Sequence, residues 1–130
     1  MKNKSIVGIA LVLILLFSAF TVQAFARANA HIDEASILLN SSMSATFSCS
    51  TRAKYNISVG SVQLEVKNSN GTWSFVKNLS APPSASNVSN YTKVMNYSSS
   101  CTSGKTYRIK AVFYAGTESV SRISAEKKYN

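Results

Sequence analysis

The residues of this 130-residue chain that could do chemistry are two cysteines, one histidine and five carboxylates. Cys49, Cys101 and His31 together lack the fourth ligand of a structural zinc site. In an oxidising compartment, an isolated pair of cysteines is more often a structural disulfide than a redox or metal site. We therefore predict a disulfide between Cys49 and Cys101, no metal and no cofactor. A disulfide that closes the loop of about fifty residues between Cys49 and Cys101 would stabilise a small domain by about 4 kcal/mol.

The carboxylates do not form a pattern typical of an enzyme. Asp33 and Glu34 are adjacent, and neighbouring side chains on a strand point to opposite faces. His31 lies in a stretch that we expect to be disordered, so we interpret it as a bystander. The remaining carboxylates are scattered among lysines and serines: Glu65, Glu118 and Glu126. The sequence also has no Gly-rich phosphate loop and no serine elbow. We predict that the protein is not an enzyme.

The N-terminus indicates the compartment. Lys2 and Lys4 precede an uncharged apolar run over residues 6–22, which ends in the small-residue sequence Ala24-Phe25-Ala26. This order is typical of a secretory signal peptide. We predict a signal peptide over residues 1–26, cleaved after Ala26, although a cut after Ala24 also fits, and a secreted, extracellular remainder. The alternative is an uncleaved anchor that leaves the domain outside the membrane. In both cases nucleic acid is excluded as a partner, and the membrane is contacted only through an uncleaved leader.

Alternation of apolar and polar residues predicts strands in the rest of the chain. In residues 62–67 the apolar side chains point one way and the polar ones the other. Asn70-Gly71 suits a tight hairpin turn, so Trp73 and Phe75 belong to the return strand. Residues 107–114 alternate again, and their expected core face is Tyr107, Ile109, Ala111 and Phe113.

Further strands are expected at 35–39, 43–49, 91–97 and 118–129. Residues 80–86 contain two prolines and predict an exposed, mobile connection. About seven short strands in roughly 100 residues predict an all-β fold, a single antiparallel two-sheet sandwich over residues 35–130. Residues 27–34 are expected to form a disordered N-terminal stretch.

Two glycine motifs carry a family resemblance. Gly104-x-x-Tyr107 opens one predicted strand, and Gly116-x-x-Ser119 precedes the next; both resemble the sixth and seventh strands of fibronectin type III domains. The resemblance implies an immunoglobulin-like or fibronectin type III-like sandwich, in which Tyr107 is a corner tyrosine bonded to the preceding backbone. Cys101 would then tie the loop entering the sixth strand to the second strand.

The whole layout is also similar to small secreted β-sandwich proteins of Gram-positive bacteria, most of them uncharacterized. Gln63 and the Asn70-Gly71-x-Trp73 hairpin carry this second likeness. It implies a bacterial, extracellular protein.

The surplus of positive charge predicts a surface patch. The net charge is +9, or +7 without Lys2 and Lys4. The alternation places three basic residues on one outer sheet face, with a fourth beside them: Lys67, Arg108, Lys110 and Arg122. Such a patch could hold an anionic polymer or lipid head groups. The alternative, which we favour, is that these charges keep an exposed sheet soluble.

Trp73 has two interpretations. It is either an exposed platform on which a sugar ring stacks or a large side chain that caps the core. We favour core packing.

Seven Asn-x-Ser/Thr tripeptides are present, more than the Ser/Thr content alone would supply. They begin at Asn40, Asn56, Asn70, Asn78, Asn87, Asn90 and Asn96. In a eukaryotic secreted protein they would predict heavy glycosylation. In a bacterial protein such tripeptides usually carry no glycan, and the resemblance favours that interpretation.

These observations predict a secreted, non-catalytic module that binds at the cell surface. Its partner would be an anionic cell-envelope polymer or another surface protein, held by the basic face or by the loop around Pro82 and Pro83. The alternative is a small secreted effector or bacteriocin-like toxin, for which small size, positive charge and a disulfide are common.

Overall fold

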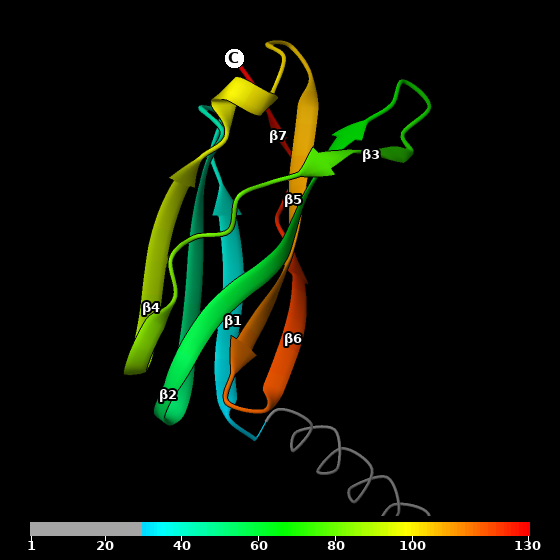
Figure 1. Ribbon diagram of the computed structural model, residues 1–130. Helices are drawn as coiled ribbons and strands as arrows, with labels where there is room; N and C mark the ends of the chain where they lie inside the picture. Colours follow the sequence, from blue (N-terminus) through cyan, green and yellow to red (C-terminus); the bar gives the residue numbers. More distant parts are fainter. Residues whose placement is uncertain (1–29) are drawn as a thin grey trace, which may run out of the picture. The chain divides into compact units, whose positions relative to one another are not determined.

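The computed structural model describes residues 30–130, which form seven β-strands and one short 3₁₀ helix (Figure 1). The predicted signal peptide, residues 1–26, lies outside the described residues. In chain order the elements are β1 (Ile32–Leu39), β2 (Ser44–Lys67), β3 (Trp73–Asn78), β4 (Ala85–Asn96), η1 (Ser98–Ser100), β5 (Thr106–Ala115), β6 (Glu118–Ile123) and β7 (Lys127–Lys128). The prediction of an all-β fold with seven strands is confirmed.

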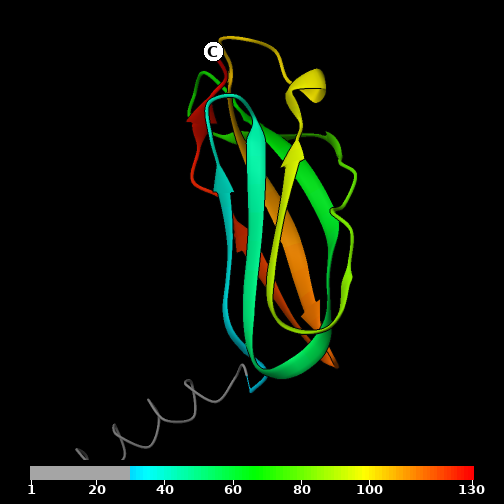
Figure 2. The same cartoon turned by 90° about the vertical axis from the view of Figure 1, so that its left-hand side faces the viewer.

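The long strand β2 organises the sheet. Its first half pairs with β1 on one side and with β4 on the other, and its second half pairs with β5 and β3. The strands β6 and β7 then pair with β5, and all these ladders are antiparallel. Because β2 has 24 residues and runs through both halves, the strands form one continuous sheet that curls into a half-barrel (Figure 1, Figure 2). The sequence predicts two separate strands, at 43–49 and 62–67, where this single strand runs.

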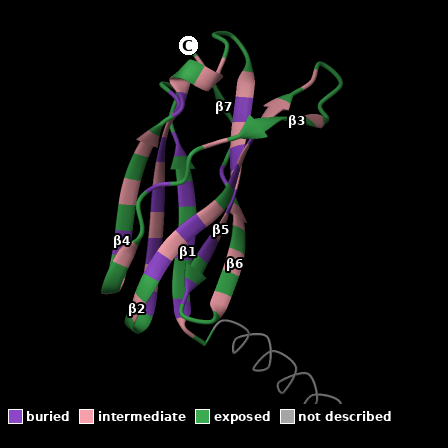
Figure 3. Cartoon of the chain, in the orientation of Figure 1, coloured by how far each residue is buried: buried purple, intermediate pink, exposed green. Residues whose placement is uncertain are grey.

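Side chains on the inside of the curl form one apolar core. The strands β1, β2 and β5 bury every second residue over most of their length (Figure 3). The predicted core face of β5 is confirmed, since Tyr107, Ile109, Ala111 and Phe113 are at most 3 % exposed. The ring of Phe113 lies 6.3 Å from that of Phe47, centroid to centroid, and so packs the two halves of the sheet together.

Several strand boundaries differ from the prediction because of long-range hydrogen bonds. The strand β1 begins at Ile32, so the prediction of disorder is wrong for residues 32–34. One carboxylate oxygen of Glu118 accepts hydrogen bonds from the backbone N–H groups of His31 and Ile32, at 2.6 and 3.0 Å. The strand predicted at 118–129 is divided into β6 and β7, and the buried Ser124 lies between them.

Most of residues 80–86, between β3 and the start of β4, are exposed as the sequence predicts, but the segment is also tied to the rest of the fold. Pro82 is buried. The hydroxyl of Tyr97 donates a hydrogen bond to the Ser80 carbonyl, and the hydroxyl of Tyr91 donates one to the Pro83 carbonyl, both at 2.7 Å. Tyr91 lies on β4 and Tyr97 directly follows its last residue, and both tyrosines are buried.

Gly71 and Tyr107 have the structural roles expected of them in the sequence analysis. Gly71 has a φ angle of +84°, which side chains rarely adopt, and it closes the hairpin between β2 and β3. The hydroxyl of Tyr107 accepts a hydrogen bond from the backbone N–H of Thr102 at 2.7 Å. This is the bond that the fibronectin type III resemblance implies for a corner tyrosine.

Cys49 and Cys101 are free thiols in the structure, and the predicted disulfide is absent. The sheet register separates them. Cys49 lies five residues along β2 from Ser44, which pairs with Asn96 at the end of β4, a separation of about 17 Å along the strand. Cys101 lies beyond that end, after η1, whereas a disulfide needs Cα atoms within about 7 Å of each other.

Burial also makes both thiols unreactive. It raises the pKa of Cys49 above its usual range and raises the pKa of Cys101 to about 11. Both are therefore protonated near neutral pH, and neither supplies a thiolate nucleophile.

Serine substitutions distinguish free thiols from a bridge. Cys49→Ser should destabilise the fold by about 1–3 kcal/mol, because it places a hydroxyl among apolar side chains. Cys101→Ser, at a half-buried site, should cost less than about 1 kcal/mol. Urea unfolding without reductant measures both. Equal losses of about 2–5 kcal/mol would instead show that each variant removes the same cross-link.

The buried tyrosines predict a loss of stability at alkaline pH. Burial, with a smaller contribution from Cys49, raises the pKa of Tyr91 to about 12. Burial, with a smaller contribution from Tyr91, raises that of Tyr97 to about 12. An unfolded tyrosine ionises near pH 10, so this stabilisation is complete below about pH 10 and is lost as the pH rises to about 12. The free energy of unfolding of Tyr91→Phe/Tyr97→Phe should fall less steeply over this range than that of the unsubstituted protein, and parallel curves would contradict the assignment.

Candidate binding surface

Three of the four residues of the predicted basic patch lie together on the outer side of the sheet. Directly opposed residues of an antiparallel ladder point to the same face. Glu65 of β2 pairs with Phe75 of β3 and with Arg108 of β5, and Lys67 pairs with Trp73. We call this surface the basic aromatic face and define it by Glu65, Lys67, Trp73, Phe75, Arg108 and Lys110.

An irregularity in β2 turns these side chains outward. Val59 is buried, and so is Val62, although residues three apart on a regular strand point to opposite faces. The register with β5 shifts between Gly60 and Gln63, and Ser61 has a φ angle of +50°. This bulge reverses the alternation, so that even-numbered residues point inward after it and Glu65 points outward.

Arg108 is held between a carboxylate and an aromatic ring. Its Nε donates a hydrogen bond to Oε1 of Glu65 at 2.7 Å, and its guanidinium carbon lies 4.2 Å from the centroid of the Trp73 ring. The Glu65 and Arg108 side chains are only 14 % and 25 % exposed. Partial burial strengthens both the ion pair and the cation–π contact, so Arg108 is fixed in place beside Trp73.

Neighbouring acids neutralise most of the positive charge of the face. Besides the pair of Arg108 with Glu65, the Nζ of Lys67 contacts both carboxylate oxygens of Glu126 at 3.1 Å. Lys110 forms no ion pair within residues 30–130. The face therefore presents one unpaired cation and not the cluster that the sequence predicts.

Arg122 does not point outward with the other three basic residues, although it lines one shallow depression together with Lys110. It pairs with Ala111 of β5, whose side chain points into the core. Its Nε donates a hydrogen bond to the backbone carbonyl of Ala35 at 3.0 Å. Arg122 thus joins β6 to β1.

The favoured interpretation of Trp73 as a core residue is also wrong. Trp73 pairs with Lys67, whose side chain points outward, and it is half-buried under Arg108. Phe75, two residues on, is 57 % exposed. Figure 3 shows that β3 has no buried residue, and Figure 1 shows the β2–β3 hairpin projecting from the rest of the sheet.

Exposed apolar groups continue this face towards β6. Ile123, which pairs with Lys110, is 51 % exposed, and Tyr114 is 40 % exposed. A shallow depression of about 310 Å³ lies between β2, β5 and β6. Its lining residues include Ser61, Gln63, Lys110, Val112, Ser121 and Ile123.

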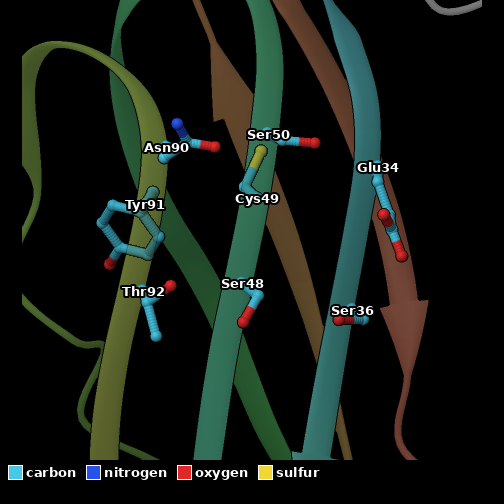
Figure 4. A pocket seen from close by; sticks show the side chains of 8 residues that line it. All are labelled: Glu34, Ser36, Ser48, Cys49, Ser50, Asn90, Tyr91 and Thr92. Atoms are coloured by element: carbon cyan, nitrogen blue, oxygen red, sulfur yellow. The ribbon is translucent and has the colours of Figure 1, made fainter.

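A second depression, of about 330 Å³, lies on the opposite half of the sheet and is lined by small polar groups (Figure 4). Its outer side chains are Glu34 and Ser36 of β1, Ser48 and Ser50 of β2, and Asn90 and Thr92 of β4. The sequence analysis missed this surface. The signal was the hydroxyl at every second position from residue 44 to 50, which marks one face of a strand.

The predicted bystander His31 has a structural role. Its Nδ1 lies 2.7 Å from the hydroxyl of Tyr55, its ring packs at a tilt against that of Tyr55 with the centroids 4.7 Å apart, and its backbone N–H donates a hydrogen bond to Glu118. Asp33 forms an ion pair with Arg52 at 2.9 Å.

Within residues 30–130, no three His, Cys, Asp or Glu side chains gather in a group that could hold a metal ion. Within the same residues, no helix has the length and hydropathy needed to cross a membrane.

Comparisons with known proteins add no relative. No family model, no curated protein and no solved structure matches the chain. The candidate site therefore rests on the geometry of this chain alone.

The only tryptophan reports on the stack with Arg108. Arg108→Ala should shift the Trp73 fluorescence to longer wavelength, because it uncovers the ring, and should destabilise the fold by about 1–3 kcal/mol by leaving Glu65 without its partner. Lys67→Ala is the matched control and should cost no more than about 1 kcal/mol, since the pair of Lys67 with Glu126 is exposed. An unchanged spectrum for Arg108→Ala would contradict the stack.

Proposed function

We propose that this chain is a secreted, non-catalytic binding module that recognises another surface protein through the basic aromatic face. The observation that carries the proposal is the fixed stack of Trp73, Arg108 and Glu65 beside the exposed ring of Phe75. Tryptophan, arginine and tyrosine dominate the energetics of protein interfaces when a rigid support presents them. Here the support is the continuous sheet.

The strand pairing supports the proposed relation to fibronectin type III-like sandwiches. β1, the first half of β2, and β4 are neighbours, as are β3, the second half of β2, β5 and β6. Two groups of three and four strands that face each other across one core are what such a sandwich requires. The bond from Thr102 to Tyr107 supports the same relation. The predicted signal peptide over residues 1–26 supports the proposal that the protein functions outside the cell.

The charge pairing favours a protein partner over an anionic polymer. A polyanion would be held mainly by unpaired cations, and only Lys110 is unpaired on this face within the described residues. By contrast, Phe75, Tyr114 and Ile123 expose apolar surface there. Apolar anchors bind a complementary protein surface and are of little use to a highly charged polymer.

Binding of the labelled protein to intact producing cells tests the proposal. Phe75→Ala should weaken binding about tenfold or more, because loss of an interface anchor costs more than about 1.4 kcal/mol. Leu38→Ala is the matched control, since Leu38 is 68 % exposed on another strand of the sheet, β1, and it should leave binding unchanged. Protease treatment of the cells should abolish binding.

Two outcomes would overturn the proposal. Binding that survives protease treatment, is abolished by moderate salt and is lost in Lys110→Glu would identify an anionic polymer as the partner. Equal binding by Phe75→Ala and the unsubstituted protein would show that the basic aromatic face is not the site.

A further inference from the structure

The Asn-x-Ser/Thr tripeptides all begin at exposed asparagines. In residues 30–130, seven of the nine asparagines begin such a tripeptide, while serine and threonine make up 28 of the 101 residues. Random placement would give about two or three. The enrichment therefore needs a cause other than composition.

Local turns account for three of the seven. In each of these, Oδ1 of the asparagine accepts hydrogen bonds from both the backbone N–H and the hydroxyl of the residue two positions later. Such a turn needs a hydroxyl residue at that position for its own geometry. The three pairs are Asn40 with Ser42, Asn70 with Thr72, and Asn96 with Ser98.

No turn explains the other four, Asn56, Asn78, Asn87 and Asn90. All four lie in strands, and none bonds to the hydroxyl residue two positions later within residues 30–130. Their Nδ2 groups also have no partner within the described residues. The one bond that their side chains make runs from the backbone N–H of Asn87 to Oδ1 of Asn56, at 3.0 Å, and leaves Nδ2 of Asn56 available.

We propose that Asn56, Asn78, Asn87 and Asn90 are acceptors of N-linked oligosaccharides, which replaces the expectation of unmodified asparagines that the resemblance to bacterial proteins favours. The donor is an oligosaccharide joined through its anomeric carbon to a lipid phosphate or diphosphate on the outer side of the exporting membrane. A bond forms between the anomeric carbon and Nδ2 while the bond from that carbon to the phosphate oxygen breaks. Nδ2 loses one proton, which passes to the departing lipid phosphate or to water, and the lipid phosphate leaves with the electron pair of the broken C–O bond, so no oxidant or reductant is needed. The proposal depends on export of the chain but not on the proposed binding function.

The four positions share a place in the fold. Asn78 ends β3, Asn87 and Asn90 lie on β4, and Asn56 of β2 is bonded to Asn87. Among residues 30–130, the strands β3 and β4 pair only with β2, so each has an open edge in this part of the chain. Open edges invite pairing with other chains, and bulky hydrophilic sugars there would prevent it. No asparagine lies on β5 or β6, whereas Asn78 pairs with Gln63 of β2, so a glycan on Asn78 would lie at the β3 edge of the basic aromatic face and leave its β5 part uncovered.

Mass spectrometry of the protein isolated from the medium of its producing cells tests the proposal. Glycopeptide fragmentation should locate sugar on Asn56, Asn78, Asn87 and Asn90. Asn68 is the internal control, because it lies beside Asn70 but begins no tripeptide of this kind, and it should be unmodified. Unmodified peptides at all four positions, or sugar confined to the three turn asparagines, would overturn the proposal.

Variants separate modification from folding. Asn87→Gln and Ser89→Ala should each remove the same glycan and lower the intact mass equally, apart from the substitution itself, although Ser89→Ala keeps the asparagine. Asn68→Gln should remove none. A glycan that persists on Asn87 in Ser89→Ala would contradict the acceptor rule on which the proposal depends.

Discussion

The hydrogen bonding of β2 is the constraint on which the rest of the structure depends. One strand of 24 residues forms ladders with β1, β3, β4 and β5, so no half of the sheet exists without it. The bulge at Ser61 sets which side chains each half presents to the core. A strand without that bulge would point Glu65 into the core and Leu64 to solvent. The ion pair of Glu65 with Arg108 and the stack of Arg108 on Trp73 therefore follow from one backbone irregularity in β2.

Local pattern was sufficient for those parts of the fold in which each residue's role depends on its near neighbours. The alternation in β5 predicts its core face, and Asn70-Gly71 predicts the hairpin. Both are decided within a few residues of chain. The bond from Tyr107 to the preceding backbone is implied instead by the fibronectin type III resemblance that Gly104-x-x-Tyr107 carries. Alternation also marks most of the strands, even where β2 joins two predicted ones, but not the two-residue β7.

The remaining features depend on register between distant segments, which alternation does not encode. Trp73 follows a tight turn, and only its pairing with Lys67 places it on the outer side. Cys49 and Cys101 belong to the same small domain, yet their positions along the strands keep them too far apart to bond. The segment at 80–86 has the composition of a mobile loop, and the hydroxyls of Tyr91 on β4 and of Tyr97 just after it hold this segment. The formal charge overstates the positive charge of the basic aromatic face for the same reason. The carboxylates that pair with Arg108 and Lys67 lie 43 and 59 residues away along the chain.

The hydrogen bonds that join β1 and the residue before it to β6 affect the order in which the chain can fold. Glu118 binds the backbone at His31 and Ile32, and Arg122 binds Ala35, across sequence separations of 86 and 87 residues. β1 therefore lacks its bonds to β6 until nearly the whole polypeptide is available, and contacts of such long range form slowly. The contacts that close β1 against β6 therefore complete the fold last, after both segments have been synthesised.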